Sequence, residues 1–171
     1  SEMCIRDRGG GRIIGEGCHF VDFLTFLIGQ PPITVTANAL PDYGRYNEDN
    51  VVLTFTFPDG SIGTVTYLAN GNKSFPKERI EVFCGGKIAI LDDYHSLTLV
   101  ANSSRQVLRS RLRQDKGHQA EWLAFTTALR SSGLPPIPYA HLFGVAQATF
   151  TSLQALRGRT SLSITQDNKL D

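Results

Sequence analysis

Apolar residues recur at helical spacing in three segments of the chain. The first stripe lies between Gly15 and Gly29 and consists of Phe20, Phe23, Leu24 and Leu27. Gly29 precedes two prolines, which predicts that this helix ends near Ile28. The second stripe comes before Gly133 and consists of Trp122, Phe125 and Leu129. The third comes before Gly158 and consists of Leu142, Val145, Ala146, Thr149, Leu153 and Leu156. We therefore expect one early helix and two late ones.

Between these helices the apolar period changes to two residues, which is typical of strands. Residues 51–57 and 62–68 alternate in this way around a turn at Pro58-Asp59-Gly60-Ser61, and they predict a hairpin. Further strands are expected at 33–40, 79–84, 87–91, 96–100 and 107–112, with a last short one at 161–164. Because the connections are short, neighbouring strands should be antiparallel. The element order predicts an α+β fold, with an open, mostly antiparallel sheet of about six strands and helices packed on one face.

Length and composition exclude several classes of protein. The composition, with 41% hydrophobic and 19% charged residues, is that of a globular protein. The length of 171 residues is enough for one domain and only just enough for two. Its net charge of +1 predicts no nucleic-acid or acidic-lipid partner. No apolar run is long enough to cross a membrane. The three cysteines are too few and too scattered for a disulfide framework or a metal cluster, so we expect no metal and a cytoplasmic protein.

The first eight residues, SEMCIRDR, have no periodicity and none of the features of a signal peptide. They are typical of translated sequencing adapter, and we interpret residues 1–8 as a non-native leader. The natural protein is then expected to begin upstream. Residues 9–165 are interpreted as a single domain, and residues 166–171 as a tail.

Glu16, His19 and Asp22 form the densest polar cluster in an apolar setting, and each lies three residues from the next. This spacing places neighbouring side chains on adjoining parts of one helical surface. A carboxylate beside an imidazole raises its basicity, so His19 could exchange a proton with a hydroxyl near neutral pH. The alternative is structural: an acid at a helix start, a satisfied histidine and a solvated aspartate.

The stretch GGGRIIGEGCHFVDFLTFLIG, residues 9–29, resembles the opening of the C-terminal domain of the glucose–fructose oxidoreductase/inositol dehydrogenase (Gfo/Idh/MocA) family. A glycine triplet, His19 and Asp22 match that pattern. The runs DNVVLTFTFPDGSIGTVTYLANGNKSFPKERIEVF and KGHQAEWLAFTTALRSSGLPPIP are similar to members whose first motif reads G-E-x-C-H-F. One position departs from the family: Gly15 stands where an acid is expected, and Glu16 follows one place later.

The resemblance implies the substrate-binding half of an NAD(P)-dependent oxidoreductase that acts on a sugar, nucleotide sugar or cyclitol hydroxyl. His19 would be the acid/base, with Glu16 or Asp22 orienting it. NAD or NADP would be bound mainly by an N-terminal Rossmann domain that this chain lacks, together with the family's catalytic lysine. We therefore expect the chain to be inactive alone. No G-x-G-x-x-G follows a strand here.

Other polar positions could recognise a sugar-like small molecule. Asn70, Asn72 and Lys73 lie in a polar loop between predicted strands, and His118 lies at a predicted helix start. The resemblance also implies a homo-oligomer formed through the sheet face. Two alternatives stay open: a non-catalytic ligand-binding or subunit-pairing module of the same fold, and a free-standing small α+β enzyme or binding protein without a cofactor domain.

Overall fold

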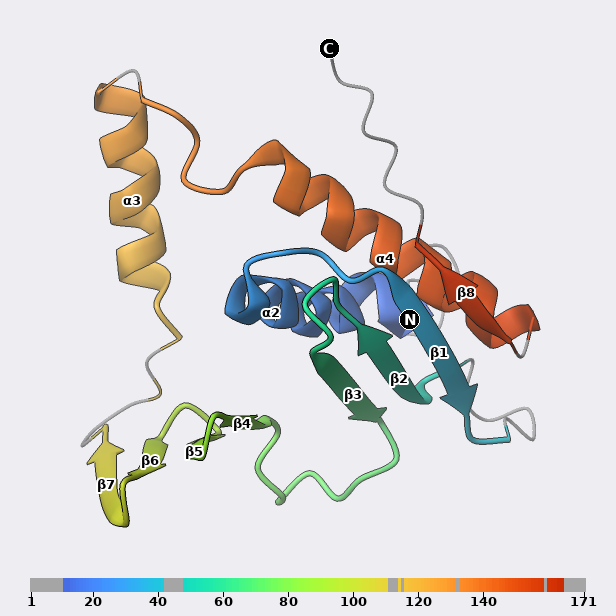
Figure 1. Ribbon diagram of the computed structural model, residues 1–171, viewed down its shortest axis with the longest axis horizontal. Helices are drawn as coiled ribbons and strands as arrows, with labels where there is room; N and C mark the ends of the chain where they lie inside the picture. The colour runs from blue at the N-terminus through green and yellow to red at the C-terminus, as the bar shows by residue number, and fades with distance from the viewer. Residues whose placement is uncertain are drawn as a thin grey trace. The chain divides into compact units, whose positions relative to one another are not determined.

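The computed structural model describes residues 11–41, 48–110, 114, 116–131, 133–158 and 160–164 (Figure 1). The expected leader at 1–8 and the tail at 166–171 lie outside these residues. The chain divides into two compact units. The first unit comprises Ser1–Asn70 and Ile137–Asp171, and the second comprises Gly71–Pro136.

The first unit contains an antiparallel sheet with strand order β3-β2-β1-β8. Its strands are β1 (Thr34–Ala39), β2 (Asn50–Thr56), β3 (Ile62–Leu68) and β8 (Ser161–Ser163). The hairpin predicted around residues 58–61 is confirmed, because β2 pairs with β3 in register from Asn50↔Leu68 to Thr56↔Ile62. The short last strand β8 pairs with β1, which leaves β1 and β2 at the centre of the sheet.

Helices cover one face of this sheet (Figure 1). A π-helical turn, η1 (Ile13–Gly17), leads directly into α2 (Cys18–Ile28), and α4 (Tyr139–Gly158) packs against β1, β8 and α2. The predicted end of the first helix is confirmed. Gly29 has φ 82° and its amide donates to the carbonyl of Thr25 at 2.8 Å. A left-handed glycine at this position closes a helix without steric cost.

The hydrophobic core lies between this sheet and its helices. Alternate strand residues point toward the helices, and Val35, Leu53 and Phe55 are completely buried. Every residue of the core cluster belongs to the first unit. The helix α2 approaches the sheet closely at Gly63, where an added Cβ would lie 2.8 Å from a methyl group of Leu24.

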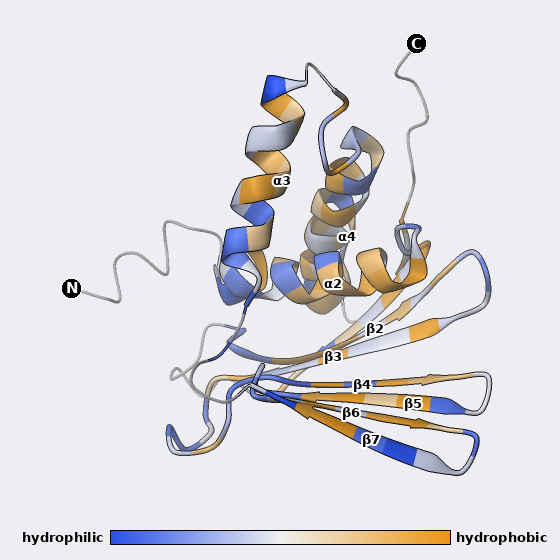
Figure 2. Ribbon diagram, turned by 90° about the vertical axis from the view of Figure 1, so that its left-hand side faces the viewer, coloured by the Kyte–Doolittle hydropathy of each residue, from blue (hydrophilic) through white to orange (hydrophobic). Residues whose placement is uncertain are grey.

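The second unit contains the antiparallel sheet β4-β5-β6-β7 and the helix α3 (His118–Arg130). Its strands are β4 (Arg79–Cys84), β5 (Lys87–Asp92), β6 (Ser96–Ala101) and β7 (Ser104–Arg109). The register places an aliphatic set on one face: Ile80, Val82, Ala89, Leu91, Leu97, Leu99 and Leu108. The opposite face also carries apolar residues: Phe83, Ile88, Ile90, Val100 and Val107. Figure 2 shows hydrophobic residues along α3 and these strands. In the described part of this unit, none of the apolar side chains is fully buried.

The predicted α+β class, with antiparallel strands and helices, is confirmed. Each of the eight segments expected as strands overlaps an observed strand, but among the residues that the structure describes these strands form two four-stranded sheets and not one sheet of about six strands. Local periodicity identifies strands but does not state which strands pair, and pairing is what separates one sheet from two. The predicted Trp122 helix is present, although its apolar stripe is exposed.

Candidate functional site

The π turn and α2 carry the three residues predicted to do chemistry. The amide of Cys18 donates to the carbonyl of Ile13, five residues earlier, as a π turn requires. The wider turn changes the angle between Glu16 and His19 from that of a regular α-helix. Both side chains are exposed, and neither a hydrogen bond nor an ion pair joins them in the described structure. Exposure leaves the His19 ring accessible to a molecule outside the chain.

Asp22 has a different partner from the one expected. Its Oδ1 lies 2.6 Å from Nε2 of His141, on the first turn of α4. The side chain of His141 is 18% exposed and that of Asp22 is 47% exposed, so the contact lies at the margin of the packed interface. The pair joins α2 to α4 and fixes the helix that carries His19. Sequence reasoning missed His141 because 119 residues separate it from Asp22.

A groove of about 250 Å³ lies where the π turn, α2 and α4 meet. Its lining comes from the π turn, α2 and α4, and consists of Ile14, Cys18, Leu142, Val145, Ala146, Thr149 and Phe150. Burial raises the pKa of the Cys18 thiol, so this thiol is protonated at neutral pH. His19 is the next residue after Cys18, but its side chain does not line the groove.

Arg12 connects the start of the glycine-rich motif to the first sheet. Its Nη1 donates to the hydroxyl of Tyr67 at 3.2 Å, and its Nε lies 3.3 Å from Oδ2 of the buried Asp49. The pKa of Arg12 is raised. The largest cause is its hydrogen bond to Tyr67, and electrostatic interaction with Tyr67 and Asp49 adds smaller effects. This network holds the beginning of the π turn against β3.

The residues predicted to bind substrate fall in both units. Asn70 ends the first unit, and its backbone amide donates to the side-chain Oδ1 of the buried Asn50 at 3.1 Å. In the second unit, Oδ1 of Asn72 accepts from the amide of Ser74 at 2.9 Å. Lys73 is exposed on the same loop.

His118 is also exposed. Its Nδ1 lies 3.8 Å from Oε2 of Glu121, one turn further along α3. A role in substrate binding stays a prediction for Asn70, Asn72, Lys73 and His118.

Among the described residues, the glycine patterns do not fit a dinucleotide cradle, which requires a strand, a glycine-rich loop and a helix N-terminus in succession. Gly15-x-Gly17 lies inside the π turn. Gly85 and Gly86, with φ values of 53° and 75°, close the β4–β5 hairpin.

The described residues contain no group of three His, Cys, Asp or Glu side chains placed to hold a metal ion. Within the same residues, no helix is both long enough and apolar enough to cross a membrane.

These features define an α+β domain with helices on one sheet face and a histidine-bearing first helix, and they agree with the resemblance drawn from the sequence. The family model described as the GFO/IDH/MocA C-terminal domain matches residues 2–87. The chain belongs to this family. The comparison with curated proteins finds no match.

Solved structures show the same fold at low sequence identity. An oxidoreductase from Agrobacterium radiobacter, in complex with NAD+, L-tartaric acid and magnesium, is 16% identical with a TM-score of 0.73 over 89% of this chain and 48% of its own. Aldose–aldose oxidoreductase from Caulobacter crescentus, complexed with glycerol, is 16% identical with a TM-score of 0.70 over 90% and 47%.

Levoglucosan dehydrogenase in complex with NADH is 14% identical, with a TM-score of 0.75 over 91% of this chain and 50% of its own. The chain thus spans about half the length of the solved structures that it matches.

Proposed function

We propose that this chain is the substrate-binding half of an NAD(P)-dependent oxidoreductase that acts on a hydroxyl of a sugar, nucleotide sugar or cyclitol. The observation that carries the proposal is an exposed His19 on α2, inside the segment that matches the family. The solved structures of this fold include oxidoreductases bound to NAD+ or NADH, which supports a nicotinamide cofactor. Free thiols at Cys18 and Cys84 support a reducing compartment such as the cytoplasm.

Side chains of this chain would accept and release the proton of the reaction. His19 would accept the proton of the substrate hydroxyl during oxidation, or return it during reduction. Glu16 lies three residues before His19 and, as the family resemblance implies, would orient its imidazole. Asp22 holds α2 against α4 through His141, and this contact positions the helix under His19. The nicotinamide, when bound by the family's N-terminal half, supplies the hydride exchange.

The test uses the full-length protein that carries this chain. His19→Ala should remove most turnover, a loss of about 10²–10⁴-fold for a general acid/base, while binding of NAD or NADP is retained. His95→Ala is the matched control, because His95 is an exposed histidine on the turn between β5 and β6. Unaltered turnover in His19→Ala, measured by NAD(P)H absorbance over a panel of sugars, would refute the proposal.

Asn70, Asn72, Lys73 and His118 are proposed to contact the substrate. They offer amide, ammonium and imidazole groups, which suit hydrogen bonding to hydroxyl groups. Asn72→Ala should raise KM with little change in kcat, since it would remove binding present in both the ground state and the transition state. An unchanged KM would exclude Asn72 from the binding site.

We further propose that the protein forms a homo-oligomer through a sheet face. The aliphatic face of the second sheet supports this, because Leu99 and Leu108 are 36% and 48% exposed. Leu99→Glu should lower the mass measured by sedimentation. Thr98→Glu, on the opposite face of the same strand, should leave the mass unchanged. Equal masses for wild type and Leu99→Glu would contradict this interface.

A second candidate is a non-catalytic ligand-binding or subunit-pairing module, and Gly15 is the observation that favours it. The acid expected at this position is absent, although a Cβ there would meet nothing within 4 Å. Under this alternative the full-length protein shows no turnover on the sugar panel, with or without Gly15→Asp. Gain of turnover in Gly15→Asp would instead indicate a disabled enzyme.

A further inference from the structure

A second hollow lies within the second unit. Its volume is about 360 Å³, and its walls include Lys73, Phe75, Lys77, Asp93 and Lys116. This volume is in the range of small-molecule sites, roughly 300–1,000 Å³. All of these residues belong to the second unit.

The charge around the hollow is positive. Three lysines line it, against the carboxylate of Asp93 in the lining and that of Glu78, which pairs with Lys116, so the sum is positive. The ammonium of Lys116 is held by Glu78, at 3.0 and 3.2 Å from its two carboxylate oxygens, and lies 5.3 Å from the centre of the Tyr94 ring. The hydrogen bond that Lys116 donates to Glu78 raises the pKa of Lys116, so this group stays charged well above neutral pH.

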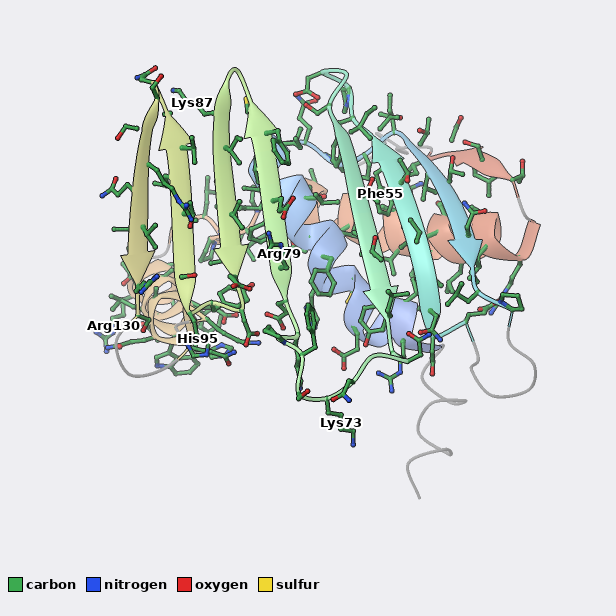
Figure 3. The ribbon with its side chains drawn as sticks, turned by 90° about the horizontal axis from the view of Figure 1, so that it is seen from below. Phe55, Lys73, Arg79, Lys87, His95 and Arg130 are labelled. Atoms are coloured by element: carbon green, nitrogen blue, oxygen red, sulfur yellow. The ribbon has the colours of Figure 1, made fainter. Side chains whose placement is uncertain are left out.

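Lys73 and Lys77 are not balanced in the same way. Within the part of the chain that the structure describes, neither makes an ion pair with a carboxylate, and both are exposed. Figure 3 shows Lys73 projecting from the loop between β3 and β4. Two uncompensated ammonium groups beside a third, oriented one attract a multiply charged anion more than a single exposed lysine does.

Phe75 adds an apolar surface to the charged one. Its side chain is 73% exposed although it lines the hollow. Its amide donates to the carbonyl of Asn72 at 3.1 Å, and Oδ1 of Asn72 accepts from Ser74, so the loop is held in place locally. An exposed aromatic ring provides a face on which a base or sugar ring can stack.

We propose that this hollow binds a small organic phosphate, with its phosphates against Lys73, Lys77 and Lys116 and its ring against Phe75. A nucleoside diphosphate has both features. Lys73 is also among the residues proposed above to contact the substrate, so the test measures binding alone and requires no turnover.

The test measures binding to the full 171-residue chain by isothermal titration calorimetry at low ionic strength. The probes are inorganic pyrophosphate, uridine and uridine diphosphate. We expect pyrophosphate to bind, uridine diphosphate to bind more tightly, and uridine alone not to bind. The double variant Lys73→Gln/Lys77→Gln should lower the affinity for pyrophosphate and for uridine diphosphate at least tenfold. Phe75→Ala should lower the affinity for uridine diphosphate to that for pyrophosphate.

Lys87→Gln is the matched control. Lys87 is an exposed lysine at the β4–β5 turn, five residues from Asp92 at the other end of β5, a strand length of roughly 17 Å. Figure 3 shows Lys87 and His95 at opposite ends of the second sheet. Lys87→Gln should leave both affinities unchanged. No binding of either phosphate, or equal weakening by Lys87→Gln, would overturn the proposal. Circular dichroism melts show whether the exposed variants remain folded.

Discussion

At the scale of single residues, space around the glycines decides which positions tolerate a side chain. Gly144 lies in α4, and an added Cβ would lie 2.4 Å from Cβ of Pro31 and 2.7 Å from its Cγ. The proline ring is rigid, so it cannot move aside as the end of a long side chain can. At Gly15 the corresponding space is open.

Gly144→Ala should therefore destabilise the chain by about 1–3 kcal/mol, the usual cost of overpacking. Gly15→Ala is the matched control and should stabilise it by about 0.5–1 kcal/mol, since alanine loses less backbone freedom in a helical turn. Urea unfolding followed by circular dichroism measures both changes. Equal stability of Gly144→Ala and wild type would show that α4 can shift away from Pro31.

The β2–β3 turn contains a carboxylate with a lowered pKa. Oδ1 of Asp59 accepts from the amide of Ser61 at 3.0 Å, and Oδ2 accepts from its hydroxyl at 2.9 Å. Both hydrogen bonds lower the pKa of Asp59, and the one from the backbone amide has the larger effect. The stability that they contribute is therefore fully present above the unfolded pKa of about 3.9 and is lost as the pH falls through the lower folded value.

Wild type should melt at a higher temperature than Asp59→Ala at pH 6, and the difference should shrink as the pH falls from 5 toward 2. Melting followed by circular dichroism across this range checks the expectation. A difference that stays constant with pH would mean that the charged form of Asp59 does not stabilise the turn.

At the scale of elements, the contact between α2 and α4 determines how His19 is presented. Asp22 and His141 meet at 2.6 Å on the two helices, and Val21 and Thr25 on α2 are buried in the same packing layer. Among the described residues, the exposed side chain of His19 has no comparable hydrogen-bond partner. Its geometry therefore depends on the helix, and the helix depends in part on the Asp22–His141 pair.

Asp22→Asn and His141→Ala should each destabilise the chain by about 0.5–1.5 kcal/mol, the net value of a partly exposed hydrogen bond. The double variant should lose less free energy of unfolding than the two single variants together, because each single variant removes the same Asp22–His141 interaction. His118→Ala, at an exposed helix start, is a control that should change stability little. Additive losses in the urea-unfolding cycle would show that the pair contributes no coupling energy.

At the scale of the molecule, burial is concentrated in the first unit. The core cluster draws on η1, α2, β1–β3 and α4, whereas the described strands of the second unit are half-buried or exposed. Strands with less buried apolar surface open at a lower free energy. Cover on the aliphatic face of the second sheet, as in the proposed homo-oligomer, would raise that free energy.

Hydrogen exchange should reveal this difference. We expect amides of β1 and β2 to exchange last and those of β7, whose six residues are all exposed, to exchange first among the strands. Mass spectrometry of peptides from a monomeric sample measures the order. Equal protection of β2 and β6 would show that the second unit is stabilised as strongly as the first.

Much of the fold follows from local signals. Gly29 and Gly158 end helices where the sequence predicted, and the turn at 58–61 joins β2 to β3. The candidate site could be predicted only in part. His19 was identified from its motif, but the π turn and the separation of the strands into two sheets carry no local signature.

The sequence by itself determined the identity and ends of the elements, because apolar period, glycine and proline act within a few residues of one another. It also determined the family, through the motif around His19. Only the tertiary structure decided which strands pair, where the core lies, and that Asp22 meets His141 across 119 residues. Such contacts depend on how whole elements pack, and packing is a property of surfaces that no short stretch of chain contains.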